Sequence, residues 1–244
     1  MKKLSLLIAV LSIVTFNACK KNNETVMAPP APYKCVSCKT TPDALAANNA
    51  SSKGIYKGVF IGSSGTIMFD IANNGTTITA VIVIDGVTVN LTSNITWVAG
   101  QPYVAPFTGT LNGSPVTINF SVGVSGGTPT VTSSTIPGHP NATLTVIKET
   151  SNDLVECFEG TYSTTLPETG TFNFILSRTA GIWGGISRKT GATTTSNVSG
   201  TISNNKLYVP GQTAPVGTLN SDQLSGTSQD SNNSTVTITG QRTL

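Results

Sequence analysis

Short runs in which apolar residues alternate with other residues are the feature that most constrains the fold of this chain. In the run 65–71, single residues separate Ile67, Phe69 and Ile71, and the run 116–122 has the same period. Further runs of this kind occupy residues 144–146, 172–176 and 236–238. Because successive side chains of a β-strand point to opposite faces, each run predicts a strand with one face on a core and the other in water.

Tight turns are predicted between several of these strands. Asn74-Gly75, Asp85-Gly86 and Asn112-Gly113 favour type I′ hairpins, because these residue types tolerate a positive φ. No amphipathic helical stretch of ten residues lies between the strands, which argues against parallel βαβ construction. The sequence therefore predicts an all-β fold made of antiparallel meander strands.

The strand-rich region also repeats itself. Three short segments match counterparts at offsets of 106, 105 and 108 residues: 54–56 with 160–162, 65–69 with 170–174, and 109–112 with 217–220. We predict two related repeats, residues 53–150 and 151–244, which form barrel or sandwich units and meet through apolar faces. Two pairs of residues are expected at equivalent positions: Tyr56 with Tyr162, and Gly65 with Gly170.

The strand-opening Gly54-Ile55-Tyr56, the even series of short strands and the closing Thr-Ile-Thr-Gly-Gln-Arg of residues 237–242 resemble calycin-type up-and-down β-barrels. The resemblance implies a closed barrel whose central cavity carries a small apolar ligand. A β-sandwich produces the same sequence cues, so both architectures stay open at this point.

The N-terminus has the layout of a secretory signal peptide. Lys2 and Lys3 precede residues 4–16, which carry no charge and are mostly apolar. As a helix this run spans only about 20 Å at 1.5 Å per residue. That length is short of the roughly 30 Å hydrocarbon core of a bilayer, which disfavours a permanent transmembrane helix.

The end of the apolar run, Phe16-Asn17-Ala18-Cys19, resembles the lipobox of bacterial lipoproteins. Ala18 and Cys19 match that motif, whereas Phe16 and Asn17 replace its more usual residues. The resemblance implies that residues 1–18 are a signal peptide and that Cys19 becomes the acylated first residue of the mature chain. The expected partner is then a lipid bilayer, and the expected location is the bacterial cell envelope, in the outer membrane. More than one acyl chain is needed for stable anchoring.

Residues 19–52 are predicted to form a flexible tether. They contain the proline-rich stretch 27–32 and no sustained apolar period. A short helix is expected only at residues 43–50. A flexible chain of about 33 residues has a root-mean-square reach near 30 Å, and the prolines stiffen it.

The distribution of charge excludes nucleic-acid binding. The net charge is +3, but six of the 14 Lys and Arg residues precede residue 40. From Ser51 onward, eight basic residues face nine acidic ones, which gives a net charge of −1. Binding to phosphates needs a basic face, and the body has too few cations to form one.

Cys35 and Cys38 form a Cys-x-x-Cys, the most clearly defined motif of the mature chain. Lys39 follows it where haem attachment needs a His, and no second Cys-x-x-Cys completes a zinc site. In an oxidising compartment a disulfide between Cys35 and Cys38 is the better interpretation. Cys157 is then left over, either buried as a small apolar residue or paired with one of the two. No metal site or cofactor is predicted.

Catalytic motifs are incomplete in this sequence. Residues 123–127 match Gly-x-Ser-x-Gly, but Ser125 is followed by a stretch that cannot begin a helix, and His139 lies in a turn. Glu156 and Glu159 are three residues apart, which on a strand points them to opposite faces. We therefore expect a protein that is not an enzyme. A hydrolase of envelope polysaccharide or ester is the disfavoured alternative.

Binding needs less specialised residues than catalysis does. Trp183 lies among glycines and is a candidate platform for stacking a sugar or another ligand, and Tyr103 and Tyr208 lie beside turn residues. Trp97 is expected in the core. The sequence therefore predicts an envelope lipoprotein with a binding or scaffolding body. A calycin-like carrier of a small apolar ligand and a glycan-binding surface are the two forms that such binding would take.

Overall fold

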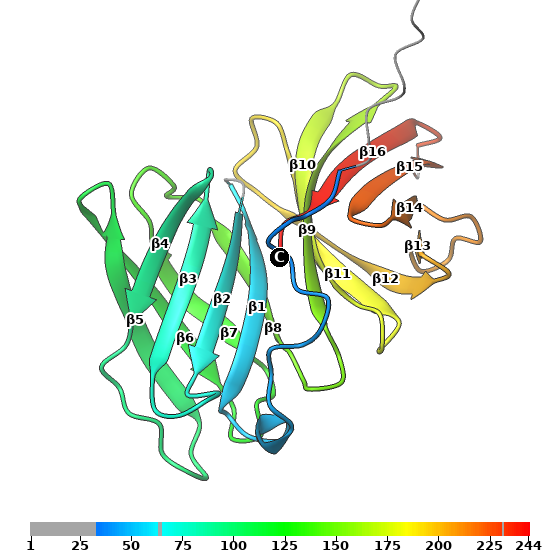
Figure 1. Cartoon of the computed structure of the whole chain (residues 1–244). Coiled ribbons are helices and arrows are strands. Elements are labelled where there is room, and N and C mark those ends of the chain that lie inside the picture. The colour runs from blue at the N-terminus through cyan, green and yellow to red at the C-terminus, as the bar shows by residue number, and fades with distance from the viewer. Residues whose placement is uncertain (1–32, 63–64, 231) are drawn as a thin grey trace, which may run out of the picture. The chain divides into compact units, whose positions relative to one another are not determined.

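The computed structural model describes residues 33–62, 65–230 and 232–244. In these ranges, the regular structure comprises one short 3₁₀ helix, Ala46–Asn48, and sixteen β-strands (Figure 1). This confirms the all-β fold. The sixteen strands divide into two groups of eight, which follow one another along the chain.

The first eight strands form one antiparallel sheet that is nearly closed, called here the first barrel. The strands are β1 Gly54–Ile61, β2 Gly65–Ile71, β3 Ile78–Ile84, β4 Val87–Thr92, β5 Tyr103–Leu111, β6 Ser114–Val122, β7 Thr130–Thr135 and β8 Thr143–Lys148. Each strand from β1 to β6 pairs with the next in the chain, and β8 returns to pair with β1. Among the described residues, the β7–β8 seam is the one place where no ladder closes the ring.

The last eight strands form a closed antiparallel barrel, the second barrel. The strands are β9 Val155–Thr164, β10 Thr169–Ser177, β11 Ile182–Lys189, β12 Ser196–Ser203, β13 Lys206–Tyr208, β14 Gly217–Asn220, β15 Gln223–Gln229 and β16 Thr235–Arg242. Here β16 pairs with β9 along seven residue positions and completes the ring. The predicted meander of two related units is therefore correct, and both units are barrels rather than sandwiches.

Two of the three predicted hairpin turns have the expected backbone. Asp85 and Gly86 have φ values of 46° and 77°, and Asn112 and Gly113 have 51° and 81°. A type I′ turn requires positive φ at both central residues. Asn74-Gly75 lies instead in a longer connection between β2 and β3.

The two barrels share a plan, but only part of the predicted residue equivalence is correct. A Cβ on Gly65 would meet the ring of Phe60, and a Cβ on Gly170 would meet the ring of Tyr162. Gly65 and Gly170 are therefore equivalent, and the structural counterpart of Tyr162 is Phe60.

Two of the sequence matches were misleading. Tyr56 pairs with Lys148, and the corresponding pair in the second barrel is Phe158 with Arg242, so Tyr56 matches Phe158. The third pair of matching segments is also not structurally equivalent. Residues 109–112 begin on the fifth strand of the first barrel, whereas residues 217–220 form the sixth strand of the second. Register depends on hairpin length, which a constant offset does not reveal.

The interior of the first barrel is filled by aromatic rings. Tyr56, Phe69, Phe107 and Phe120 are fully or almost fully buried there. Phe69 stacks on Phe120 with ring centroids 4.3 Å apart and meets Phe107 edge-on at 5.0 Å. These ring contacts are part of one continuous apolar core in the first barrel.

Strand β1 is buried on both of its faces. Its inward residues belong to the core of the first barrel, whereas Val59 packs outward against Val155, Cys157 and Ile175 of the second barrel. Apolar faces therefore do join the two repeats. Cys157 is a free thiol buried in this junction, and burial raises its pKa to about 12.

An ion pair lies in the same junction. Lys57 Nζ is 2.6 Å from Glu149 Oε2, and both side chains are almost wholly inaccessible to solvent. Glu149 also accepts hydrogen bonds from the backbone N–H of Asp43, at 2.7 Å, and of Val155, at 3.1 Å. One carboxylate thus connects the N-terminal segment, the first barrel and the start of the second.

Residues 33–52 pack against the barrels, which differs from the flexible tether expected for residues 19–52. The Lys148 ammonium donates hydrogen bonds to the carbonyls of Asn48, at 2.7 Å, of Ser51, and of Lys53, at 3.0 Å. The helix Ala46–Asn48 lies within the range predicted for it. Because Lys148 points into the first barrel beside Tyr56, these contacts fasten the segment over one end of that barrel. Residues 19–32 lie outside the described ranges.

We expect Lys57→Met to lower the free energy of unfolding by about 3–5 kcal/mol, because it leaves the Glu149 carboxylate buried without a counter-charge. Unfolding in urea, followed by circular dichroism, measures this. The exposed Lys206→Met is the matched control and should change stability by less than about 0.5 kcal/mol. Equal effects of the two variants would contradict the role given to the ion pair.

We expect Lys148→Met to cost about 1–3 kcal/mol, because three backbone carbonyls lose their donor. Differential scanning calorimetry measures the shift in melting temperature, again beside Lys206→Met. An unchanged melting temperature would show that water replaces the ammonium without cost and that the segment is not held by it.

Candidate functional site

The second barrel contains a cavity of about 450 Å³ that is open to solvent. Its walls come from inward positions that recur at every second residue of a strand, such as Phe172 and Phe174 on β10 or Val236 and Ile238 on β16. Further apolar lining residues are Trp183, Val198, Leu207, Val209, Val216 and Leu224. The apolar residues of the alternating runs in the second barrel therefore form the inner surface of a hollow barrel.

Apolar side chains inside this barrel are incompletely packed. Six of those that contact its core are only partly buried: Tyr162, Val198, Ile202, Val209, Val216 and Ile238. All of them except Ile202 line the cavity, so the residual exposure of these five side chains is to the cavity. An apolar cavity of this size matches the range in which proteins hold small molecules.

Comparison of the two barrels shows why the second is hollow near its first hairpin, between β9 and β10, where the first is filled. Register places Ile84 of β3 opposite Gly65, and Lys189 of β11 opposite Gly170. The apolar residues that fill the first barrel are accordingly replaced by polar ones in the second: Ile82 by Ser187, Ile84 by Lys189, and Val89 by Ser196. The second barrel thus opens through a polar rim.

The opposite end of the second barrel, called here the base, is closed by charged side chains that form ion pairs. Arg242 Nη1 lies 3.0 Å from Glu156 Oε1 and 3.7 Å from Asp222 Oδ1. Arg178 Nε approaches the other oxygen of Glu156 at 2.6 Å. Arg242 and Glu156 are both buried, so a charge-balanced cluster fills this end of the barrel.

The segment 33–39 lies against that cluster. Tyr33 Oη donates to the carbonyl of Arg242 at 3.0 Å, and the backbone N–H of Cys35 donates to Asp222 Oδ2 at 2.9 Å. Arg242 Nη2 donates to the carbonyl of Lys39 at 2.6 Å. Each barrel therefore has a cation at the end of its last strand that binds the carbonyls of the N-terminal segment.

The open end, the mouth, carries acidic residues on two hairpins. Glu168 lies between β9 and β10; it accepts a hydrogen bond from Tyr162 Oη at 3.0 Å and pairs with Lys189 Nζ at 2.9 Å. These contacts, the one with Lys189 above all, lower the pKa of Glu168. Asp230 follows β15, and its Oδ1 accepts the backbone N–H groups of Asn232 and Ser234, both at 2.8 Å. Both acidic residues line the cavity.

Trp183 is not the exposed stacking platform that its glycine neighbours suggested. It is only 7% exposed and packs edge-on against Phe174, with ring centroids 5.6 Å apart. Its Nε1 donates to the carbonyls of Thr201 and Tyr208. The space beside the glycines is occupied by neighbouring strands, so the ring lies inside, where it forms part of the cavity wall.

The two tyrosines predicted as ligand contacts are not brought together. Tyr103 is 2% exposed, and its hydroxyl donates to the carbonyl of Ile95, so it belongs to the core of the first barrel. Tyr208 is half-buried on β13 of the second barrel, and its side chain does not line the cavity. Turn residues beside an aromatic ring did not distinguish a surface position from a core position.

The cysteines have separate positions. Cys35 and Cys38 are joined by a disulfide within the segment that covers the base of the second barrel. Cys19, the predicted acylation site, lies outside the described residues, as does the predicted signal peptide.

Glu168 and Asp230 were missed by sequence reasoning, which singled out neither residue. The alternation of Val236 and Ile238 indicated which residues point inward. It did not indicate which hairpins meet at the same end, since that depends on strand register.

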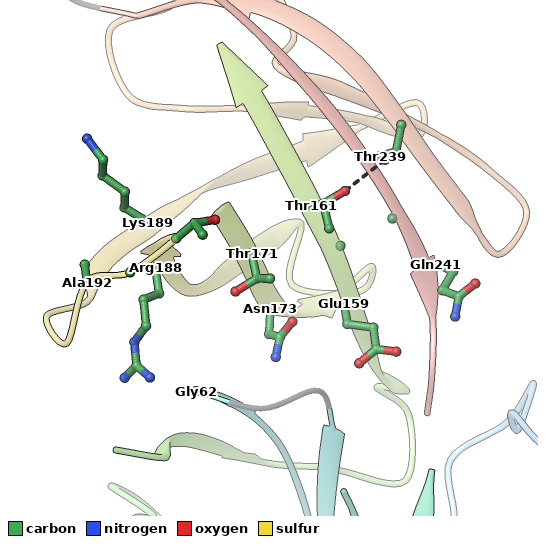
Figure 2. A pocket seen from close by; sticks show the side chains of 14 residues that line it. Gly62, Glu159, Thr161, Thr171, Asn173, Arg188, Lys189, Ala192, Thr239 and Gln241 are labelled. Carbon is green, nitrogen blue, oxygen red and sulfur yellow. Dashed lines mark hydrogen bonds between the residues drawn. The ribbon is translucent and has the colours of Figure 1, made fainter. Parts of the chain in front are cut away.

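A larger hollow of about 690 Å³ lies on the outside of the second barrel (Figure 2). Figure 2 shows the side chains of Glu159, Asn173 and Arg188 pointing toward Gly62. In the described structure, Glu159 Oε2 and Arg188 Nε are buried without a hydrogen-bond partner, and burial raises the pKa of Glu159. Among the described lining residues Ala192 is the one with a wholly apolar side chain, and the others are glycines or carry a polar group.

Glu156 and Glu159 lie on opposite faces of β9, as their spacing predicted. Glu156 is in the ion cluster at the base, and Glu159 is in the outer hollow. Within the described ranges, no three His, Cys, Asp or Glu side chains gather as metal ligands. No helix in the same ranges is long and apolar enough to cross a bilayer.

Comparisons of the chain with protein-family models, with curated proteins and with solved structures find no match.

Proposed function

We propose that this protein is a non-enzymatic lipoprotein of the bacterial cell envelope whose second barrel binds a small apolar ligand. The observation that carries the proposal is the cavity of about 450 Å³, lined by aromatic and aliphatic side chains inside a barrel with a closed base. Such a cavity removes most of a small ligand from water, and this burial stabilises the complex by about 25 cal/mol per Å² of apolar surface.

The difference between the barrels supports a division of roles. The first barrel is filled by its own side chains, whereas the second leaves five inward apolar side chains partly accessible in its cavity. A core of the first kind stabilises a fold without leaving room for a ligand. We therefore assign scaffolding to the first barrel and binding to the second.

The envelope location is supported by two features. The sequence opens with a charged and then apolar segment that ends in Ala18-Cys19, as in bacterial lipoproteins. Cys35 and Cys38 are disulfide-bonded, which fits an oxidising compartment outside the cytoplasm.

The cavity is tested by filling it. Val198 points into the cavity from β12, whereas the adjacent Ser199 is exposed on the outside of the same strand. We expect Val198→Phe to weaken binding of the neutral apolar probe N-phenyl-1-naphthylamine at least tenfold, because the added ring occupies the ligand's space. Ser199→Phe, the matched control, should bind it within twofold of the wild type.

Probe fluorescence measures the affinities, and the melting temperature of each variant checks that it is folded. In a Trp97→Phe background, Trp183 is the remaining tryptophan, and its emission should change when the probe binds. Equal probe binding by Val198→Phe and the wild type would place the probe elsewhere, for example in the outer hollow, and would contradict the proposal.

Lipidation is tested by metabolic labelling. Cells given an alkyne-tagged fatty acid should label the wild-type protein and not Cys19→Ala, because the acyl chains are attached through this residue. The wild type should also sediment with membranes, which Cys19→Ala should not. Equal labelling of both proteins would refute the assignment of Cys19.

A further inference from the structure

We infer that the cavity of the second barrel selects amphiphiles with a cationic head, such as a primary amine on an apolar tail, over those with a carboxylate head. This inference rests on the proposed function, since it names the class of ligand for the same cavity. It starts from the charges that line the cavity. Among its described lining residues, Glu168 and Asp230 are acidic and none is basic.

Both acidic residues lie at the mouth, beyond the apolar walls. Glu168 is in the β9–β10 hairpin, and Asp230 is in the β15–β16 hairpin. The two hairpins are bound together, because Thr165 Oγ1 lies 2.9 Å from Ser234 Oγ and the backbone N–H of Thr165 donates to the carbonyl of Thr235 at 3.0 Å. A ligand whose tail fills the cavity therefore places its head beside two carboxyl side chains.

The nearest cation does not change this preference. Lys189 reaches Glu168 from the outer rim, where its side chain is 57% exposed, and it lines the outer hollow rather than the cavity. Its charge offsets one of the two acidic residues, which leaves the mouth with a net charge of −1. A ligand ammonium is attracted to that charge, whereas a ligand carboxylate is repelled by it.

Hydrogen bonding beside Glu168 favours the same ligands. The Tyr162 hydroxyl lies 3.0 Å from Glu168 and already donates its proton to that carboxylate. It has no second proton to offer to a ligand carboxylate. An ammonium head brings its own three donors, which suit the acceptor oxygens of Glu168 and Asp230.

Three ligands with ten carbons each test the inference: decylamine, decan-1-ol and decanoate. Each competes with N-phenyl-1-naphthylamine for the full-length protein at neutral pH. We expect decylamine to bind at least tenfold more tightly than decanoate, with decanol between them. In the double variant Glu168→Gln and Asp230→Asn, decylamine should lose roughly tenfold in affinity, whereas decanol should stay within twofold.

Glu159→Gln is the control, because it removes a carboxylate from the outside of the same barrel and should leave the order of the three ligands unchanged. Decanoate binding as tightly as decylamine, with the neutral probe still bound in the cavity, would overturn this inference and leave the proposed function standing. Failure of both the neutral probe and decanol to bind would instead overturn the proposed function. A preference for decylamine that persists in the double variant would show that other charges produce it, and would also overturn the inference.

Discussion

The buried ion pair of Lys57 and Glu149 is the interaction on which the arrangement of both barrels depends. Strand β1 has no solvent-facing side, so the charge of Lys57 must be neutralised inside the protein. Glu149 does this while accepting N–H groups from residues before the first barrel and at the start of the second. Burying one of these charges without the other would cost several kcal/mol of folding free energy. An arrangement of the N-terminal segment and the two barrels that keeps Lys57 beside Glu149 is therefore far more favourable than one that buries them apart.

The two barrels use one plan for their closed ends and different plans for their interiors. Lys148 and Arg242 are equivalent cations on the last strand of each barrel, and each binds backbone carbonyls of the segment before β1. That segment therefore seals both barrels in turn. Inside, the first barrel has Ile82, Ile84 and Val89 where the second has Ser187, Lys189 and Ser196 at the open end of its cavity.

The sequence was sufficient to predict strands, hairpins and two repeats, because a period of two and Asp-Gly or Asn-Gly turns are local signals. It was insufficient wherever register or tertiary packing decided the outcome. Tyr162 was matched to Tyr56 and not to Phe60, because the two first hairpins differ in length. Trp183 was placed outside because glycines surround it, although neighbouring strands fill that space. The contacts of Arg242 with residues 33–39 join positions some 200 apart in sequence, and no local pattern indicates them.

A hollow barrel gives up packing contacts that would otherwise stabilise it, and the structure shows where that loss is offset. The wall around the cavity is tied to the solid first barrel through Val59, Cys157 and Ile175, and its base is held by the ion cluster of Arg242. Both lie away from the mouth, where Ser187, Lys189 and Ser196 replace apolar residues of the first barrel. Stabilising contacts are thus concentrated at the junction and the base, and the mouth is left with polar side chains. Sites that bind ligands commonly lie in such less stabilised parts of a fold, because residues chosen for binding are not those that pack best.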